Sequence, residues 1–138
     1  MTKWSMEVER LISDRFGKDT VIALATIEKG VPYVRYVNAY YEDGAFYIIT
    51  HLLSNKMRQV KTNSTVAIAA DWFTAHARAV NLGYFGKEEN RMIANKLIHV
   101  FAQWIGNGHN DFDDENTIIL RLELTDGLLL SNGIRYTF

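Results

Sequence analysis

The chain has 138 residues, of which 48% are apolar, with a formal net charge of −1 and no cysteine. This length and composition indicate one folded domain with a hydrophobic core and exclude a disordered chain. The near-neutral charge argues against a protein that coats nucleic acid, and the lack of cysteine excludes disulfides, Cys-ligated zinc and thiol catalysis.

The N-terminus reads MTKWSMEVERL and has no apolar signal-peptide core. No window approaches the roughly 18 consecutive apolar residues that a membrane-spanning helix needs. A chain without cysteine also fits a reducing compartment. We therefore expect residues 1–138 to be a single cytoplasmic domain that contacts neither membrane nor nucleic acid.

The first predicted element is a helix over residues 5–17. Ser5 is a plausible N-cap, acidic residues follow in the first turn, and apolar residues recur at helical spacing up to Phe16. Gly17 ends the pattern. From Thr20 the period changes to that of strands, which we predict over 20–27, 32–41, 45–50, 65–72 and 74–85.

Turn residues connect these strands. Asp43-Gly44 is a strong hairpin signal, because both central residues of that turn need a positive φ. A short helix is expected to open at Ser54. A second long helix is predicted over 87–105, with a buried stripe formed by Ile93, Leu97, Val100, Phe101 and Trp104.

A polar loop over 106–116 precedes the last strands. Asp126-Gly127 and Asn132-Gly133 are both hairpin signals, so two or three strands are expected after Thr117. Six to eight antiparallel strands favour a closed or nearly closed barrel, because closure removes exposed edges. We therefore predict a mainly β fold, an antiparallel barrel with peripheral helices.

The segment from Arg35 to Lys56 is the best candidate for chemistry. Arg35 lies inside an apolar strand, where a charge is costly unless it is paired or reaches solvent. If the hairpin pairs the two strands, Arg35 lies beside the end of the third strand. There Thr50, Ser54 and Lys56 surround a helix N-terminus, which suits a phosphate. The pattern also fits an ordinary N-cap with a solvated lysine.

These motifs occur in a recognisable order: Val34-Arg35-Tyr36-Val37, then Asp43-Gly44, Ile49-Thr50 and Ser54-Asn55-Lys56. In this order and spacing the chain resembles the FMN-binding split barrels related to pyridoxamine 5'-phosphate oxidase, including the general-stress-protein type. The resemblance extends over residues 6–85, and the closing strands match in outline.

The resemblance implies a cofactor, a site and a partner. Arg35 and Lys56 would hold the FMN phosphate, and Ser54 and Thr50 would add hydrogen bonds. Backbone groups of one strand would line the flavin ring, in a homodimer with FMN at the subunit interface. The predicted FMN-binding residues are Arg35, Tyr36, Val37, Asn38, Thr50, His51, Ser54, Asn55 and Lys56.

The chain departs from the true pyridoxamine phosphate oxidases at three points. Asn55 replaces a basic residue, and Leu128-Leu129-Leu130 stands where a cross-dimer tryptophan is expected. The segment 133–138 lacks an R-L-H-D-R-like motif. We therefore expect an FMN-dependent oxidoreductase acting on another small molecule or electron donor, with no catalytic side chain identified. The alternatives are a non-enzymatic flavin- or haem-binding module and a deazaflavin-dependent reductase.

No metal site is predicted. The four histidines have no i,i+4 pair on a helix, and the acidic loop 110–115 lacks the glycine and glutamate of a calcium-binding EF-hand loop. His76 fits either a barrel surface or an interface. Neither a dinucleotide-binding G-x-G-x-x-G nor a P-loop is present.

Overall fold

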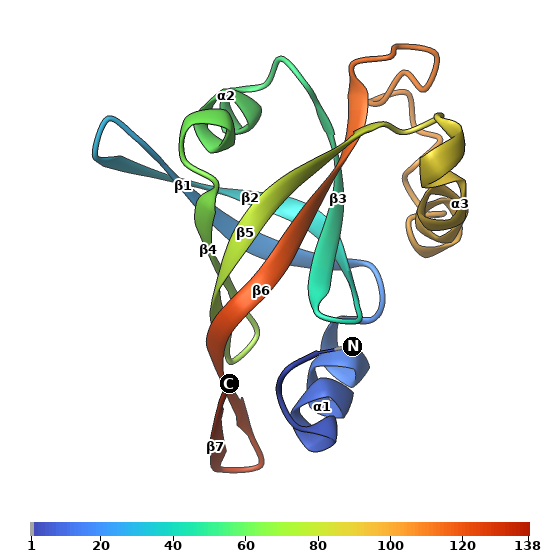
Figure 1. The fold of residues 1–138 in the computed structure, drawn as a ribbon. Coiled ribbons are helices and arrows are strands. Elements are labelled where there is room, and N and C mark those ends of the chain that lie inside the picture. The colour runs from blue at the N-terminus through green and yellow to red at the C-terminus, as the bar shows by residue number, and fades with distance from the viewer. Residues whose placement is uncertain (1) are drawn as a thin grey trace.

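The strands form one antiparallel sheet in the computed structural model, which describes residues 2–138 (Figure 1). Their order is β3-β2-β1-β4-β5-β6-β7, and an additional pairing of β3 with β6 closes the sheet into a barrel. The predicted mainly β barrel is therefore confirmed. Within residues 2–138 the strands are β1 Thr20–Glu28, β2 Val31–Glu42, β3 Ala45–His51, β4 Thr65–Ala70, β5 Phe73–Tyr84, β6 Thr117–Ser131 and β7 Ile134–Thr137.

The helices lie around the barrel. In Figure 1, α2 lies at its upper end and α1 below it, while α3 lies to one side. Ser5 caps α1 as predicted, its hydroxyl accepting a hydrogen bond from Val8 N at 3.2 Å. The helices are α1 Met6–Phe16, α2 Asn55–Thr62, the short 3₁₀ helix η1 Glu88–Asn90 and α3 Arg91–Val100.

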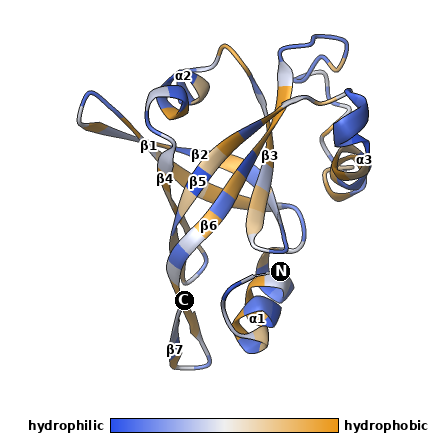
Figure 2. Cartoon of the chain, in the orientation of Figure 1, coloured by the Kyte–Doolittle hydropathy of each residue, from blue (hydrophilic) through white to orange (hydrophobic). Residues whose placement is uncertain are grey.

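Two hydrophobic clusters organise the packing. The larger one fills the barrel, where Phe16 of α1 packs on Phe46 and Phe73, and Met57 and Val60 of α2 enter from the other end. The smaller cluster lies outside, between α3 and the strands β3 and β6. Figure 2 shows the corresponding mixture of hydrophilic and hydrophobic residues along α1 and α3.

The second predicted long helix is shorter than expected. The segment 87–105 divides into η1, α3 and a series of turns after Val100. The predicted apolar stripe nevertheless packs as expected, because Phe101 and Trp104 in those turns still join the outer cluster. Spacing alone therefore identified the buried face but not the end of the helix.

Hairpins form at two of the three Asp-Gly or Asn-Gly dipeptides where they were predicted. Asp43 and Gly44 have φ values of 43° and 88°, and Asn132 and Gly133 have values of 50° and 75°. The hairpin predicted at Asp126-Gly127 is wrong, because β6 runs through it to Ser131. Thr125 instead forms a bulge there, and Gly127 serves close packing: a Cβ on it would lie 2.7 Å from the Thr74 carbonyl oxygen.

A split opens between β2 and β3. The two strands pair only at the hairpin, from Glu42↔Ala45 to Tyr40↔Tyr47, and then separate. Beyond that point β3 pairs with β6, whereas β2 continues along β1. Among the described residues, the edge of β2 over 33–39 that faces away from β1 has no strand partner.

In the part of the chain that the structure describes, none of the helices has the length and apolar character needed to cross a membrane.

Candidate functional site

The turn from β3 into α2 forms one side of the site. Ser54 is the N-cap of α2, with its hydroxyl accepting a hydrogen bond from Met57 N at 3.4 Å. Lys56, in the first turn, folds back so that its Nζ donates to Thr50 Oγ1 at 2.6 Å. The cap and the lysine therefore place an ammonium group at the end of β3, beside free N–H groups of a helix N-terminus.

Lys56 lies in a partly desolvated position. Burial lowers the pKa of its ammonium group, and the nearby charge of Arg35 lowers it further. The side chain bonds to a hydroxyl, and none of the ion pairs among residues 2–138 includes it. Lys56 is thus a half-buried cation whose charge is not compensated by the protein.

Arg35 is the second cation. Its Nη1 donates to Thr26 Oγ1 at 2.8 Å and to the Leu24 carbonyl at 3.2 Å, and its Nη2 donates to Gln59 Oε1 at 2.9 Å. Burial lowers the pKa of its guanidinium. Within the described chain, no carboxylate pairs with it.

Arg35 approaches the end of β3 by a different route from the predicted one. We expected strand pairing through the hairpin to bring it there, but Arg35 pairs with Leu24 of β1, because β2 has already left β3. The inward side chain, held by Gln59 of α2, instead brings the guanidinium toward Lys56. One cation thus comes from β2 and the other from the first turn of α2, beside the end of β3.

The residues Tyr36, Val37 and Asn38 lie along the unpaired edge of β2. Tyr36 is largely exposed, at 80% of its surface, while Val37 packs against the core. Asn38 is tied to the residue that precedes β1, its Nδ2 donating to Asp19 Oδ1 at 3.0 Å. Backbone N–H and C=O groups on an unpaired edge are available to a ligand with donors and acceptors of its own.

His51 and Asn55 have partners within the chain. Both ring nitrogens of His51 are engaged: Nε2 lies 3.0 Å from Asp114 Oδ2, and Nδ1 accepts from Leu53 N at 3.2 Å. The Asn55 Oδ1 accepts from Arg58 Nη1 at 2.8 Å. His51 therefore joins the polar loop 106–116 to the turn that carries Ser54 and Lys56.

Two residues of this site were not identified from the sequence. Thr26 and Gln59 are polar yet almost fully buried, with 0% and 2% of their surface exposed. The available signal was the inward position of Thr26 in β1, which follows the buried Ile22 and Leu24 at the strand period of two. A polar residue at such a position needs a partner, and here the partners are Arg35 and Gln59.

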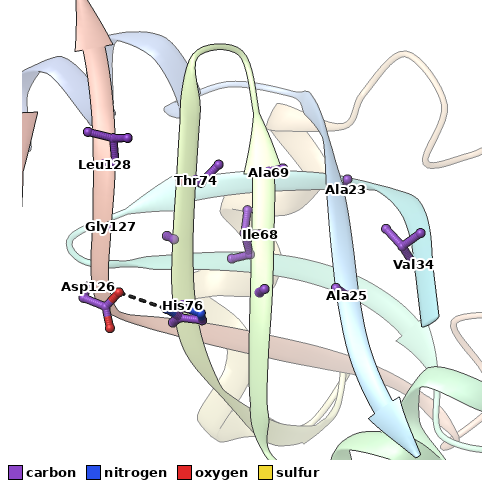
Figure 3. A pocket seen from close by; sticks show the side chains of 12 residues that line it. Ala23, Ala25, Val34, Ile68, Ala69, Thr74, His76, Asp126, Gly127 and Leu128 are labelled. Atoms are coloured by element: carbon purple, nitrogen blue, oxygen red, sulfur yellow. Dashed lines mark hydrogen bonds and ion pairs between the residues drawn. The ribbon is translucent and has the colours of Figure 1, made fainter. Parts of the chain in front are cut away.

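The outer face of the sheet carries a separate shallow groove of about 510 Å³ (Figure 3). Small side chains from β1 and β4 form its floor, and Val34 and Leu128 lie at opposite ends. His76 Nδ1 lies 2.9 Å from Asp126 Oδ1 at its margin. The floor residues are Ala23, Ala25, Ala67 and Ala69. Among the described residues, no three His, Asp or Glu side chains converge as a metal site would require.

A family model described as pyridoxamine 5'-phosphate oxidase matches residues 8–126. The chain belongs to the pyridoxamine 5'-phosphate oxidase family. The match extends from α1 into β6 and so includes both cations and the split.

The proteins similar to this chain differ widely from it in sequence. General stress protein 26 of Bacillus subtilis is 22% identical over 127 residues, which cover 92% of this chain and 91% of the relative. A crystal structure of an FAD-binding protein from Mesorhizobium loti has a TM-score of 0.68 at 14% identity, covering 90% of this chain and 91% of the other. The haem storage protein HutZ of Vibrio cholerae has a TM-score of 0.64 at 17% identity, covering 88% and 92%. These structures share the split-barrel fold with this family member, and the resemblance to the general-stress-protein type is confirmed.

Proposed function

We propose that the chain binds FMN in the split between β2 and β3 and acts as a flavin-dependent oxidoreductase on a small molecule. The observation that carries this proposal is the pair of uncompensated cations, Arg35 and Lys56, at the mouth of the split. Leaving charges partly buried without counter-ions is unfavourable, so such a pair is best explained by an anionic ligand.

The phosphate and the ring of FMN have suitable groups in this arrangement. Arg35 and Lys56 would hold the phosphate, with the N-terminus of α2 beside them. The unpaired edge of β2 near Tyr36, Val37 and Asn38 would offer backbone groups to the polar edge of the ring. When bound, a flavin supplies hydride or single-electron transfer, and the protein contributes binding, orientation and exclusion of water.

We propose further that the functional unit is a cytoplasmic homodimer. Tyr36 and Val34 are exposed on the outer face of β2 at 80% and 70%, next to the alanine floor of the groove. A second copy of the chain on this apolar face would cover both the groove and the open side of the split. Apolar patches of this kind mark interfaces, and two-fold dimers are the commonest oligomers.

The purified protein tests this proposal by its absorption spectrum and by titration with FMN. Flavin bands, or saturable binding of added FMN in the micromolar range or tighter, are expected. A Soret band would support the haem-binding alternative, and selective binding of a deazaflavin would support a deazaflavin-dependent reductase. Turnover of a nicotinamide donor with an electron acceptor would then distinguish an enzyme from a flavin carrier. A protein that binds none of these cofactors would contradict the proposal.

A further inference from the structure

The partners of Arg35 are all uncharged. Its guanidinium donates to a carbonyl, a hydroxyl and an amide oxygen, which belong to Leu24, Thr26 and Gln59. Thr26 and Gln59 are buried at 0% and 2% exposure, so the acceptor side of these bonds is shielded from water. Guanidinium groups inside proteins usually pair with carboxylates. Here neutral groups fix the orientation of Arg35 without reducing its charge.

The direction of the hydrogen bonds in this cluster is fixed. Gln59 Oε1 accepts from both Arg35 Nη2 and Thr26 Oγ1, while the same threonine oxygen accepts from Arg35 Nη1. The amide group of Gln59 faces Glu28, whose pKa is lowered chiefly by its hydrogen bond with Arg58 and also by one from Gln59. Gln59 thus stands between Arg35 and a carboxylate that Arg58 already neutralises.

The charge at the split is therefore two positive units. Lys56 bonds to the hydroxyl of Thr50, which is as neutral as the partners of Arg35. The lowered pKa of Lys56, due to burial and then to Arg35, reflects the same lack of a nearby anion. A phosphomonoester carries about −1.5 to −2 charges at pH 7, close to this value. A phosphodiester carries one charge, and riboflavin carries none.

We propose that Gln59 and Thr26 are positioning residues that set the charge preference of the site: they orient Arg35 without neutralising it, so that the split selects a phosphomonoester dianion. The inference rests on the proposed FMN site and makes it more specific. It predicts that FMN is preferred over riboflavin, which carries no charge, and over the monomethyl ester of FMN, whose phosphate carries a single charge.

The test replaces the amide oxygen of Gln59 by a carboxylate of the same shape. Gln59→Glu places a negative charge against Arg35, and FMN affinity should fall ten- to a hundred-fold. Riboflavin affinity should change less than two-fold, so the FMN-to-riboflavin affinity ratio collapses. The control is Gln103→Glu, which adds the same charge at an exposed turn after α3 and should leave the ratio unchanged.

A second pair of variants covers the case in which Gln59→Glu does not fold. Thr26→Val keeps the shape of the side chain but removes its hydroxyl, whereas Thr26→Ser keeps the hydroxyl. The valine variant should lose several-fold of the FMN-to-riboflavin ratio, and the serine variant should retain it. A purely structural role would weaken both flavins equally and leave the ratio as in the wild type.

The outcomes separate this inference from the proposed function. A wild-type protein that does not bind FMN contradicts the FMN site itself. In a second outcome, the wild type prefers FMN over riboflavin, but Gln59→Glu and Thr26→Val leave the FMN-to-riboflavin affinity ratio unchanged. This result would keep the FMN site and overturn the positioning role. Equal wild-type affinity for FMN and its monomethyl ester would also overturn the charge preference.

Discussion

Lys56 Nζ donates to Thr50 Oγ1 at 2.6 Å, so the first turn of α2 is fastened to the end of β3 by the same side chain that carries the charge. The hydroxyl is a neutral acceptor, and it fixes the position of the ammonium group while leaving its charge available. Two of the three ammonium hydrogens remain free for a ligand.

Lys56→Ala is expected to weaken FMN binding roughly ten- to a hundred-fold, since a charge-assisted hydrogen bond contributes about 1.5–3 kcal/mol. Riboflavin lacks the phosphate, so its affinity should hardly change. Fluorescence titration of both flavins measures the difference. The control is Lys61→Ala on the exposed flank of the same helix. Equal losses in the two variants would indicate a diffuse charge effect and contradict the assignment of Lys56.

Arg35→Ala should also weaken FMN binding, and it should destabilise the fold. Removing the guanidinium deprives the buried Thr26 oxygen of its donor and leaves Gln59 Oε1 with Thr26 alone, which costs about 1–3 kcal/mol of unfolding free energy. Chemical denaturation without flavin measures this cost. A variant as stable as the wild type would show that the cluster is not important for folding.

The contribution of Lys56 to the unfolding free energy of the flavin-free protein should rise with pH as this residue loses its proton. Its pKa in the folded protein lies below the usual 10.5, so between the two values the unfolded chain binds more protons and folding becomes more favourable with rising pH. Lys56→Met should be more stable than wild type below this window and should lack this rise, and Lys61→Met should retain it. Tyrosines with raised pKa values add the same opposite slope to all three proteins, so the difference between wild type and Lys56→Met isolates the lysine. Denaturation series from pH 7 to about 10 provide the measurement. A wild-type slope unchanged in Lys56→Met would assign the effect to another group.

Tyr36→Asp should shift the protein from a dimer to a monomer of 15.8 kDa, because it places a charge in the centre of the proposed apolar interface. Met92→Asp is a matched control, since Met92 on α3 is 81% exposed compared with 80% for Tyr36 but lies on another face. Light scattering at micromolar concentration distinguishes the two states. A monomeric wild type with FMN present would remove the shared-site arrangement.

Tyr41→Phe tests how the N-terminal helix is attached. The buried hydroxyl of Tyr41 donates to Glu9 Oε1 and accepts from Gly44 N at 2.9 Å, so one group joins α1 to the β2–β3 hairpin. Its loss should cost about 1–3 kcal/mol of unfolding free energy. Tyr33→Phe, at a residue that is 43% exposed, should cost little, and a similar loss in both variants would contradict this role.

Local signals predicted much of this fold correctly. The cap at Ser5, the hairpin at Asp43-Gly44 and the N-cap at Ser54 each follow from a residue type whose backbone or side chain favours one conformation. The same dipeptide reasoning failed at Asp126-Gly127. There the glycine is required by the nearby Thr74 carbonyl of β5 and the ring of Phe138, which follows β7.

The environment of Arg35 could not be predicted from the sequence for a related reason. Its position within a strand identified it as a charge that needs a partner. Thr26 and Gln59 lie 9 and 24 residues away along the chain, on β1 and α2, and only the closed barrel brings them together. Site residues that are adjacent in a sequence motif could therefore be predicted. Site residues that only the topology brings together could not.

The unpaired edge of β2 has a consequence for how the protein is produced in a cell. An edge that offers free N–H and C=O groups can pair with the same edge of another newly made chain, which is a route to aggregation. A ligand bound along residues 33–39 would block that route. We therefore expect soluble yield to depend on flavin supply: expression in riboflavin-starved cells should divert chains into inclusion bodies, and riboflavin added during synthesis should recover them.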